Sequence, residues 1–231
     1  VTTERLQFNE QTLWLGSENT KDMGGYQPFG DLFLDLAPTP QPAGDYRREL
    51  DLDQAVATTT FQRGGVTFTR EVFSTAADQV IVMRLTADQP GQIHFTAGLN
   101  TPHNPAALTA SGTRLKLTGT SNRHGNNPGQ IRFESLVELQ NEGGTVVAGE
   151  ASLTVTNADA VMLLLSCGTS YVNWRDAGGD PSVRAVRDLE TAVTKSYVTL
   201  RERHVKDHQA LFRRVAIDLG TGKNATLPTD E

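Results

Sequence analysis

Acidic side chains are the first candidates for chemistry, because the chain carries 27 Asp and Glu residues. Acid–base cleavage of a bond between sugars usually needs two carboxyl groups on opposite sides of that bond. The acids include Glu10, Asp31, Asp45, Glu49, Asp51, Asp53, Glu71, Glu134 and Glu138. No spacing marks one of them as the partner of another, and Asp31 follows a turn, where an Asp side chain commonly caps backbone N–H groups. We therefore predict no catalytic residue in this chain.

Two histidines four residues apart, His204 and His208, have the spacing that can place two zinc ligands on one helix face. Val205 stands where the H-E-x-x-H metalloproteases carry their general base. No third ligand is indicated. A capping, packing or interdomain role is the favoured interpretation of both histidines, and we predict no metal and no cofactor.

The single cysteine, Cys167, ends the most apolar run of the chain and has no neighbouring base. A buried small apolar role is favoured over a nucleophilic one, because reactive thiols need an environment that stabilises the thiolate. One cysteine also excludes an internal disulfide. No nucleophile elbow, P-loop or dinucleotide fingerprint occurs.

Polar loops and aromatic residues are suited to binding sugar hydroxyls and sugar rings. His103 lies in a rigid loop with Asn and Pro, and His124 lies in a loop rich in Asn and Gly. Flat aromatic faces come from Trp14, Tyr26, Tyr171 and Trp174. Plain surface loops are the favoured interpretation for the histidines. For Trp14 we favour a core or interdomain position, and for Trp174 groove lining and packing are equally favoured.

Strands must position these side chains, because the chain up to about residue 173 consists mostly of short extended runs. Residues 130–139 alternate between apolar and polar, and residues 161–165 are apolar on both faces, as in a central buried strand. Gly64-Gly65 predicts a hairpin, and residues 88–91 (DQPG) predict a tight reversal. We predict a mainly β fold, a large antiparallel two-sheet β-sandwich with a C-terminal helical linker.

A stiff corner is predicted at residues 26–30 (YQPFG). Pro28 fixes its own φ, and Gly30 can adopt a positive φ that other residues avoid. Tyr26 and Gln27 supply a flat face and an amide that can bind a hydroxyl group. Such a corner can hold a sheet together or line a groove.

Helices are predicted after Trp174. Asp180-Pro181 is an N-cap followed by proline at the first helical position. A stripe of apolar residues then recurs every three or four positions: Val183, Val186, Leu189, Val193 and Tyr197. Lys195-Ser196 interrupts the stripe, and a second helical stretch runs to about Arg213, before an extended segment and a polar tail.

The charge and hydropathy of the chain exclude two classes of partner. The net charge is −6 with no basic run, whereas nucleic-acid binding requires clustered Lys and Arg. The longest apolar run, residues 161–167, is too short to span a bilayer. We expect neither nucleic acid nor membrane as a partner.

Short motifs occur in order along nearly the whole chain. They are residues 9–14 (NEQTLW), 26–32 (YQPFGDL), 133–135 (FES), 158–164 (ADAVMLL), 169–171 (TSY), 179–181 (GDP), 204–208 (HVKDH) and 211–220 (LFRRVAIDLG). The ordered set resembles the N-terminal domain of the inverting α-L-fucosidases, glycoside hydrolase family 95. The resemblance implies a β-sandwich domain at 1–174, a helical linker at 175–214, and an extended strand and tail at 215–231 that lead into a helical barrel beyond this sequence.

The family places its catalytic residues in that barrel, and no position here matches their motifs. The resemblance implies an exo-acting hydrolase that removes terminal α-L-fucosyl or related galactosyl groups from a fucosylated glycan, in a periplasmic or secreted setting. This chain alone is then inactive. The candidates for the substrate rim or the interdomain surface are Tyr26, Gln27, His103, His124 and Trp174. Two alternatives stay open, namely a free-standing carbohydrate-binding module and a purely structural scaffold domain.

Overall fold

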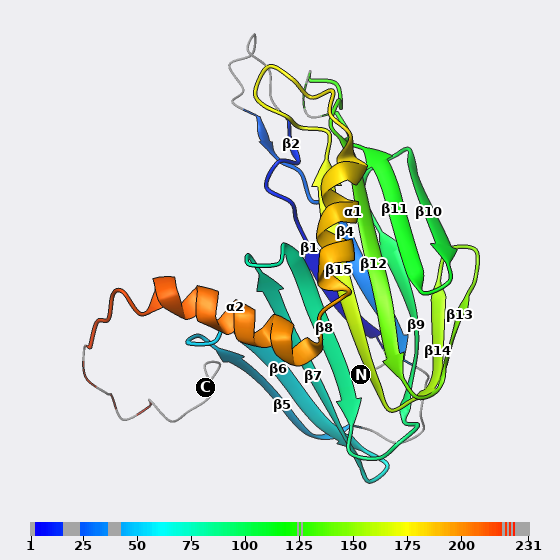
Figure 1. Ribbon diagram of the computed structural model, residues 1–231, viewed down its shortest axis with the longest axis vertical. Coiled ribbons are helices and arrows are strands. Elements are labelled where there is room, and N and C mark those ends of the chain that lie inside the picture. Colours follow the sequence, from blue (N-terminus) through cyan, green and yellow to red (C-terminus); the bar gives the residue numbers. More distant parts are fainter. Residues whose placement is uncertain are drawn as a thin grey trace.

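The computed structural model describes residues 3–15, 24–36, 43–123, 125, 127–218, 220, 222 and 224 (Figure 1). The strands in this part of the chain are β1 (Thr3–Phe8), β2 (Trp14–Leu15), β3 (Gly25–Tyr26), β4 (Gly30–Leu36), β5 (Gly44–Asp51), β6 (Val56–Arg63), β7 (Val66–Thr75), β8 (Val80–Ala87), β9 (Ile93–Asn100), β10 (Ala106–Ser111), β11 (Arg114–Thr120), β12 (Arg132–Glu142), β13 (Thr145–Ala148), β14 (Leu153–Ala158) and β15 (Ala160–Thr169). The helices are α1 (Pro181–Ala192) and α2 (Tyr197–Phe212).

Two antiparallel sheets face each other and enclose the main core. The five-stranded sheet has the order β1-β4-β9-β14-β13, and the eight-stranded sheet has the order β10-β11-β12-β15-β8-β7-β6-β5. Inward-facing residues of both sheets, such as Leu34 and Ala97 of one and Val137 and Val161 of the other, belong to one buried cluster. The predicted mainly β, two-sheet antiparallel sandwich is therefore confirmed.

Strand β15 is buried on both faces, as the sequence predicted. Its odd-numbered residues, Val161, Leu163 and Leu165, point into the core between the sheets. Its even-numbered residues Met162 and Leu164 belong to a second apolar cluster on the outer face of the same sheet. Because strand side chains alternate in direction, a strand that is apolar at every position must be covered on both sides.

The two helices cover this outer face and form a third layer (Figure 1). Helix α1 lies along β15 and β12, and α2 crosses over β7. Ala185, Leu189 and Ala192 of α1 and Leu200 of α2 are each 0% exposed. No helix in the described ranges is long and apolar enough to cross a membrane.

Helix α1 approaches β15 so closely at Gly168 that no side chain fits between the two backbones there. A Cβ atom on Gly168 would collide with the carbonyl oxygen of Pro181 and would lie 3.1 Å from the backbone nitrogen of Ala185. The predicted apolar stripe is therefore wrong at two positions, because Val183 and Val186 are exposed while alanines face the sheet. The buried face of α1 consists of Ala185, Leu189 and Ala192, and the close approach of the backbones at Gly168 favours the small residues on this face.

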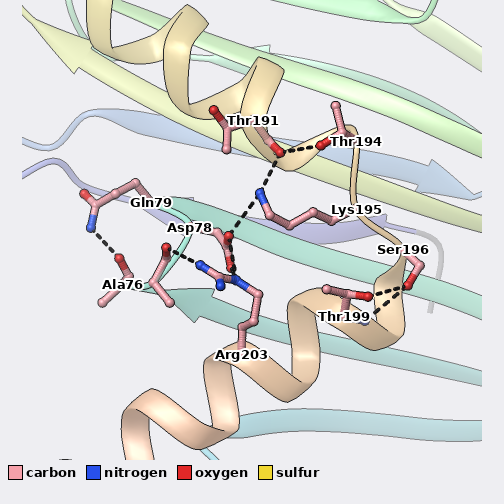
Figure 2. A network of polar contacts seen from close by, with 10 residues as sticks. Ala76, Asp78, Gln79, Thr191, Thr194, Lys195, Ser196, Thr199 and Arg203 are labelled. Atoms are coloured by element: carbon pink, nitrogen blue, oxygen red, sulfur yellow. Dashed lines mark hydrogen bonds and ion pairs between the residues drawn. The ribbon is translucent and has the colours of Figure 1, made fainter.

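A polar network fastens the helical layer to the turn between β7 and β8 (Figure 2). Asp78 lies in this turn, and both of its carboxylate oxygens lie 3.1 Å from Nε of Arg203 on α2. Lys195, between the two helices, lies 3.3 Å from the same carboxylate and donates a hydrogen bond of 2.7 Å to the carbonyl of Thr191. One buried acid thus holds both helices. We call these residues the Asp78 network.

The corner at residues 26–30 is present, but Gly30 acts differently from the prediction. Its φ is not positive, so Gly30 does not adopt the left-handed conformation that glycine permits. A Cβ at Gly30 would instead collide with the carbonyl oxygen of Asn100 on the neighbouring strand β9. Phe29 is completely buried against Phe8 and Phe133, at ring-centroid distances of 5.3 and 4.8 Å. The corner holds the sheets together.

Two of the predicted turns contain glycines with a positive φ, but one joins strands of the same sheet and the other joins strands of different sheets. Gly64 and Gly65 have φ values of 60° and 78° and form the predicted β6–β7 hairpin. The predicted reversal at residues 88–91 contains Gly91 with φ of 69°, but the strands on either side, β8 and β9, lie in different sheets. Gly91 donates a backbone hydrogen bond of 2.6 Å to Asp159, which fixes the crossover.

Candidate functional site

A groove of about 840 Å³ opens between the β2–β3 hairpin and the segment that follows β15. Its aromatic lining consists of Trp14, Tyr26, Tyr171 and Trp174, and its polar lining includes Gln11, Thr12, Gln130, Asn173, Arg175 and Asp176. In Figure 1 the two walls lie at the end of the molecule where blue β2 is next to the yellow segment after β15. We call it the aromatic groove.

The first wall is the two-stranded β2–β3 hairpin, in which Trp14 pairs with Tyr26. Their rings meet edge to face, with centroids 4.7 Å apart. Leu13 and Leu15 are buried on either side of Trp14, so the strand period of two turns the indole towards solvent, where it is 39% exposed. Of the expected core or interdomain position of Trp14, the core position is therefore wrong, and the interdomain position stays a prediction. An edge-to-face pair fixes both rings without burying them.

The second wall presents Trp174 from a tight turn. The backbone N–H of Asn173 donates to the carbonyl of Asp176 at 3.1 Å, and the N–H of Asp176 donates back at 3.0 Å. The Asn173 side chain also accepts a bond of 2.9 Å from the backbone of Arg175. Trp174 is 66% exposed, and the Arg175 guanidinium lies 4.1 Å from its ring centroid. The indole is thus presented to solvent by a hydrogen-bonded turn.

The groove has the chemistry of binding rather than of bond cleavage. Exposed rings offer apolar faces, while amides and a guanidinium offer hydrogen bonds, which is the combination that a sugar requires. Among the described lining residues only Asp176 carries a carboxylate, and its Oδ1 accepts a bond of 2.8 Å from the backbone of Gly178. The two facing carboxyl groups of glycoside hydrolysis do not come together here.

His103 is a support for the corner and not a residue of an exposed rim. Its side chain is buried, with 4% exposure, and lies 5.2 Å from the Phe133 ring. Nδ1 accepts a bond of 3.0 Å from the backbone of Asn122, so the proton resides on Nε2, which donates to the carbonyl of Pro28 at 2.9 Å. Burial lowers the pKa of His103, and the bond to Pro28 partly opposes that effect. The interpretation as a sugar contact is corrected.

The remaining predicted residues divide into two groups. Tyr26 and Trp174 come together in the aromatic groove, as described above. The Gln27 side chain lies outside its lining, and Nε2 contacts the carbonyl of Gly25 at 3.4 Å within its own turn. His124 lies outside the described residues. Sequence reasoning missed Gln11, Gln130 and Asp176, which reach the groove only through tertiary packing.

The helical histidines and the cysteine have the favoured structural roles. Nε2 of His204 contacts the carbonyl of Ala55 at 3.1 Å, and the ring stacks on Phe73. Nε2 of His208 contacts the carbonyl of Leu52 at 2.9 Å. No group of three potential metal ligands occurs among the described residues. Burial raises the pKa of the Cys167 thiol to about 12, which keeps it protonated at neutral pH.

Comparison with known proteins places the chain in a family. The model of the glycosyl hydrolase family 65 N-terminal domain matches residues 17–174. The chain belongs to this family of domains. The match ends at Trp174, so Tyr26 and Trp174 of the aromatic groove lie within the matched range, whereas Trp14 and Asp176 lie outside it.

Curated relatives of this family 65 N-terminal domain include plant and fungal proteins. "Alpha-L-fucosidase 2" of Arabidopsis thaliana is 28% identical over an alignment that covers 98% of this chain and 34% of that protein. "Probable alpha-fucosidase A" of Aspergillus niger is 27% identical, with coverage of 90% and 27%. The chain therefore spans about a third of the first relative's length. The resemblance to α-L-fucosidases that the motifs indicated is confirmed.

A solved structure has the same fold. The "Putative kojibiose phosphorylase from human microbiome" aligns with a TM-score of 0.57 over 92% of this chain and 31% of that chain. The sequence identity is 12%, so this similarity concerns the fold of the family 65 N-terminal domain alone.

Proposed function

We propose that this chain is the N-terminal, cleft-forming β-sandwich of an exo-acting α-L-fucosidase-like glycoside hydrolase. The enzyme hydrolyses terminal α-L-fucosyl or related galactosyl linkages with inversion. Residues 1–174 form the sandwich, residues 175–214 form a linker, and residues 215–231 lead to a helical barrel. The support is the similarity to α-L-fucosidases over nearly the whole chain, together with a groove whose described lining has four aromatic residues and one carboxylate.

The single observation that carries the proposal is the composition of the aromatic groove. Trp14, Tyr26 and Trp174 expose ring faces, but only one carboxylate lines the groove among the described residues. A wall of this kind orients a sugar and excludes water, while the acid and the base come from elsewhere. The helical barrel is the proposed source of both.

The helical linker is supported by the exposed apolar residues beyond the second helix. Val215 and Ile217 are 76% and 78% exposed, and residues 215–218 pair with no strand in the described part of the chain. Leu211 and Phe212 at the end of α2 are also exposed. Apolar side chains in one continuous segment are typical of a surface that another domain covers.

Two neighbouring substitutions in the intact enzyme test the proposal. Tyr26→Ala removes a ring of the groove and should lower kcat/KM by roughly 10- to 100-fold, the cost of one or two lost contacts. Gln27→Ala is the matched control, because the Gln27 side chain lies outside the groove. The isolated chain should not hydrolyse aryl α-L-fucosides. Turnover that is abolished by substituting one of its own acids, or full activity of Tyr26→Ala, would contradict the proposal.

A carbohydrate-binding module is the second candidate function. The aromatic rings of the groove are exposed in this chain by itself, so they could contact a sugar without a contribution from another domain. One measurement distinguishes this module from the cleft-forming domain of an enzyme. A module binds a fucosylated oligosaccharide as the isolated chain with a Kd below roughly 1 mM. A cleft wall that needs the barrel shows no saturable binding at that concentration.

A further inference from the structure

A second cavity, of about 320 Å³, lies at the other pole of the described structure and shares no lining residue with the aromatic groove. It opens beside the β6–β7 hairpin, between the ends of the two sheets. Its apolar lining is Leu36, Phe61, Val66, Phe68, Leu85 and Ile93. Its polar lining includes Arg63, Arg70, Thr69, Thr86, Gln92 and His94.

Arg70 is the unusual residue of this cavity, because it is a cation with 4% exposure. Its guanidinium carbon lies 5.0 Å from the ring centroid of Phe61, and Nη1 forms an ion pair with the carboxylate of Glu4 on β1. Nη2 is buried and donates no hydrogen bond within the described residues. A buried charged donor without an acceptor is costly, and proteins ordinarily satisfy such groups.

The charged side chains among the described lining residues are both arginines. Arg63 and Arg70 both line the cavity, and no acidic residue does so among the described residues. Glu4 neutralises one of these charges from outside the lining. Burial lowers the pKa of Arg70 to about 10, which leaves the guanidinium charged at neutral pH. An anion that enters this space would meet Nη2 of Arg70, a buried donor for which the described residues supply no acceptor.

A flat apolar wall lies next to the charge. Phe61 and Phe68 pair across the hairpin, with ring centroids 5.1 Å apart and an interplanar angle of 13°. On the far side, Nδ1 of His94 accepts a bond of 3.2 Å from the backbone of Asn157, so its proton resides on Nε2. The cavity therefore combines a cation, an aromatic wall and an imidazole in a volume at the small end of ligand pockets.

We propose that this cavity is a binding site for a small organic carboxylate with one ring. The carboxylate accepts from the unsatisfied Nη2 of Arg70, and the ring lies against Phe61 and Phe68. Guanidinium groups match carboxylates in geometry and charge, and the apolar wall favours a ligand that is flat on one side. The volume admits one ring but not an oligosaccharide. The site is independent of the proposed glycosidase function.

The first test maps binding on the 231-residue chain by NMR, with benzoate as the probe. Backbone shifts should change in a saturable way around Thr69, Thr86 and Ile93, with a Kd of roughly 1 mM or tighter. Benzyl alcohol, which keeps the ring and lacks the charge, should bind at least about 10-fold more weakly. D-glucuronate carries its carboxylate on a sugar ring instead of an aromatic ring. Its affinity relative to benzoate shows which of the two kinds of carboxylate the cavity binds. Shifts confined to other surfaces, or equal binding of benzoate and benzyl alcohol, overturn the proposal.

The second test removes the cation. Arg70→Met keeps an unbranched, largely apolar side chain but removes the guanidinium, and it should weaken benzoate binding at least about 10-fold. Arg47→Gln is the matched control, since Arg47 is an exposed arginine on β5 that pairs with Glu49, and this variant should bind like the parent chain. If Arg70→Met does not fold, the shift map of the parent chain decides alone. Unchanged affinity in a folded Arg70→Met overturns the assignment.

Discussion

The aromatic groove and the Asp78 network use backbone and side-chain contacts in opposite ways. In the groove, main-chain hydrogen bonds between Asn173 and Asp176 hold a turn so that Trp174 can remain 66% exposed. In the Asp78 network the side chain of Asp78 is 1% exposed, and it holds the main chain of two helices in place. One region uses backbone to present side chains, and the other uses side chains to fix backbone.

This difference separates binding from stability. Substituting an exposed side chain changes the free energy of folding little, whereas removing a buried polar group leaves its partners without compensation. We therefore expect substitutions in the helical layer to lower stability and substitutions in the groove to lower ligand affinity. Substitutions at Gly168, Asp78, His103 and Trp174 test that separation, and the expected change in unfolding free energy decreases in that order.

The largest effect is expected at the contact between α1 and β15. Gly168→Ala places a Cβ against the carbonyl oxygen of Pro181, and backbone atoms cannot move aside as a flexible side chain can. The free energy of unfolding should fall by about 3 kcal/mol, the upper range for overpacking. Gly98→Ala in β9 is the control, because no atom lies within 4 Å of its added Cβ. Denaturant unfolding of both variants measures the difference, and equal losses would show that α1 is not closely packed.

The next effect is expected at the centre of the Asp78 network. Asp78→Asn keeps the shape of the side chain but removes the charge that faces Arg203 and Lys195 (Figure 2). Unfolding should cost about 2 kcal/mol less, below the usual figure for a broken buried pair because Arg203 is 47% exposed. Hydrogen exchange should become faster in α2.

Glu49→Gln is the control for this charge removal, since both partners of the Arg47–Glu49 pair are more than half exposed. It should change stability by less than about 0.5 kcal/mol. If Asp78→Asn is as mild as this control, the network does not fasten the helices, and the proposed contrast with the groove is wrong.

Much of the fold was predictable because the pattern of apolar and polar residues along a strand shows which of its faces are buried. The alternation of apolar and polar residues in 130–139 correctly predicted β12, and the fully apolar run 161–165 correctly predicted β15. A strand that is covered on both faces has apolar residues at every position. The outer face of α1 was not predictable in the same way. Its valines point to solvent because Gly168 lets the helix backbone approach the sheet, and that contact joins residues far apart in sequence.

The aromatic groove was predicted in part. Tyr26 and Trp174 were identified from their turns, which are local signals. Trp14 was assigned to the core or to an interdomain position because it lies in an apolar extended run, although the period of two that buries Leu13 and Leu15 is the signal that turns Trp14 outwards. His103 was misjudged because a polar loop usually lies at the surface. Only the tertiary structure brings the Pro28 carbonyl to its ring.

A smaller effect is expected from His103, and it depends on pH. Because burial holds the pKa of His103 below its ordinary value of about 6.5, the unfolded chain binds the proton more readily than the folded chain. The stabilisation is therefore complete above about pH 6.5, and it is lost as the pH falls towards the lowered pKa of the folded state. Protonation also places an N–H against the N–H of Asn122.

Unfolding measured between pH 5 and pH 8 tests this, because it should show a decline at the acid end in the parent chain. His103→Gln cannot titrate, and its stability should depend less on pH in that range. Trp174→Ala alone should keep the decline in stability at acid pH, whereas the double variant Trp174→Ala, His103→Gln should lack it. This result would show that the pH dependence comes from His103 and not from the groove. Parallel pH profiles for the parent chain and His103→Gln would mean that His103 does not support the corner as described.

The smallest change in stability is expected at Trp174, and here the two regions should differ most clearly. Trp174→Ala removes an indole that is 66% exposed and that contacts the exposed Arg175, so the free energy of unfolding should change by less than about 0.5 kcal/mol. In the same variant the groove loses a ring face, and any affinity for a fucosylated oligosaccharide should fall by roughly 10-fold. Val172→Ala, a second exposed apolar residue of the same segment, should change neither quantity. A loss of stability comparable with that of Asp78→Asn would show that Trp174 is a structural residue, and the aromatic groove would then not be a binding surface.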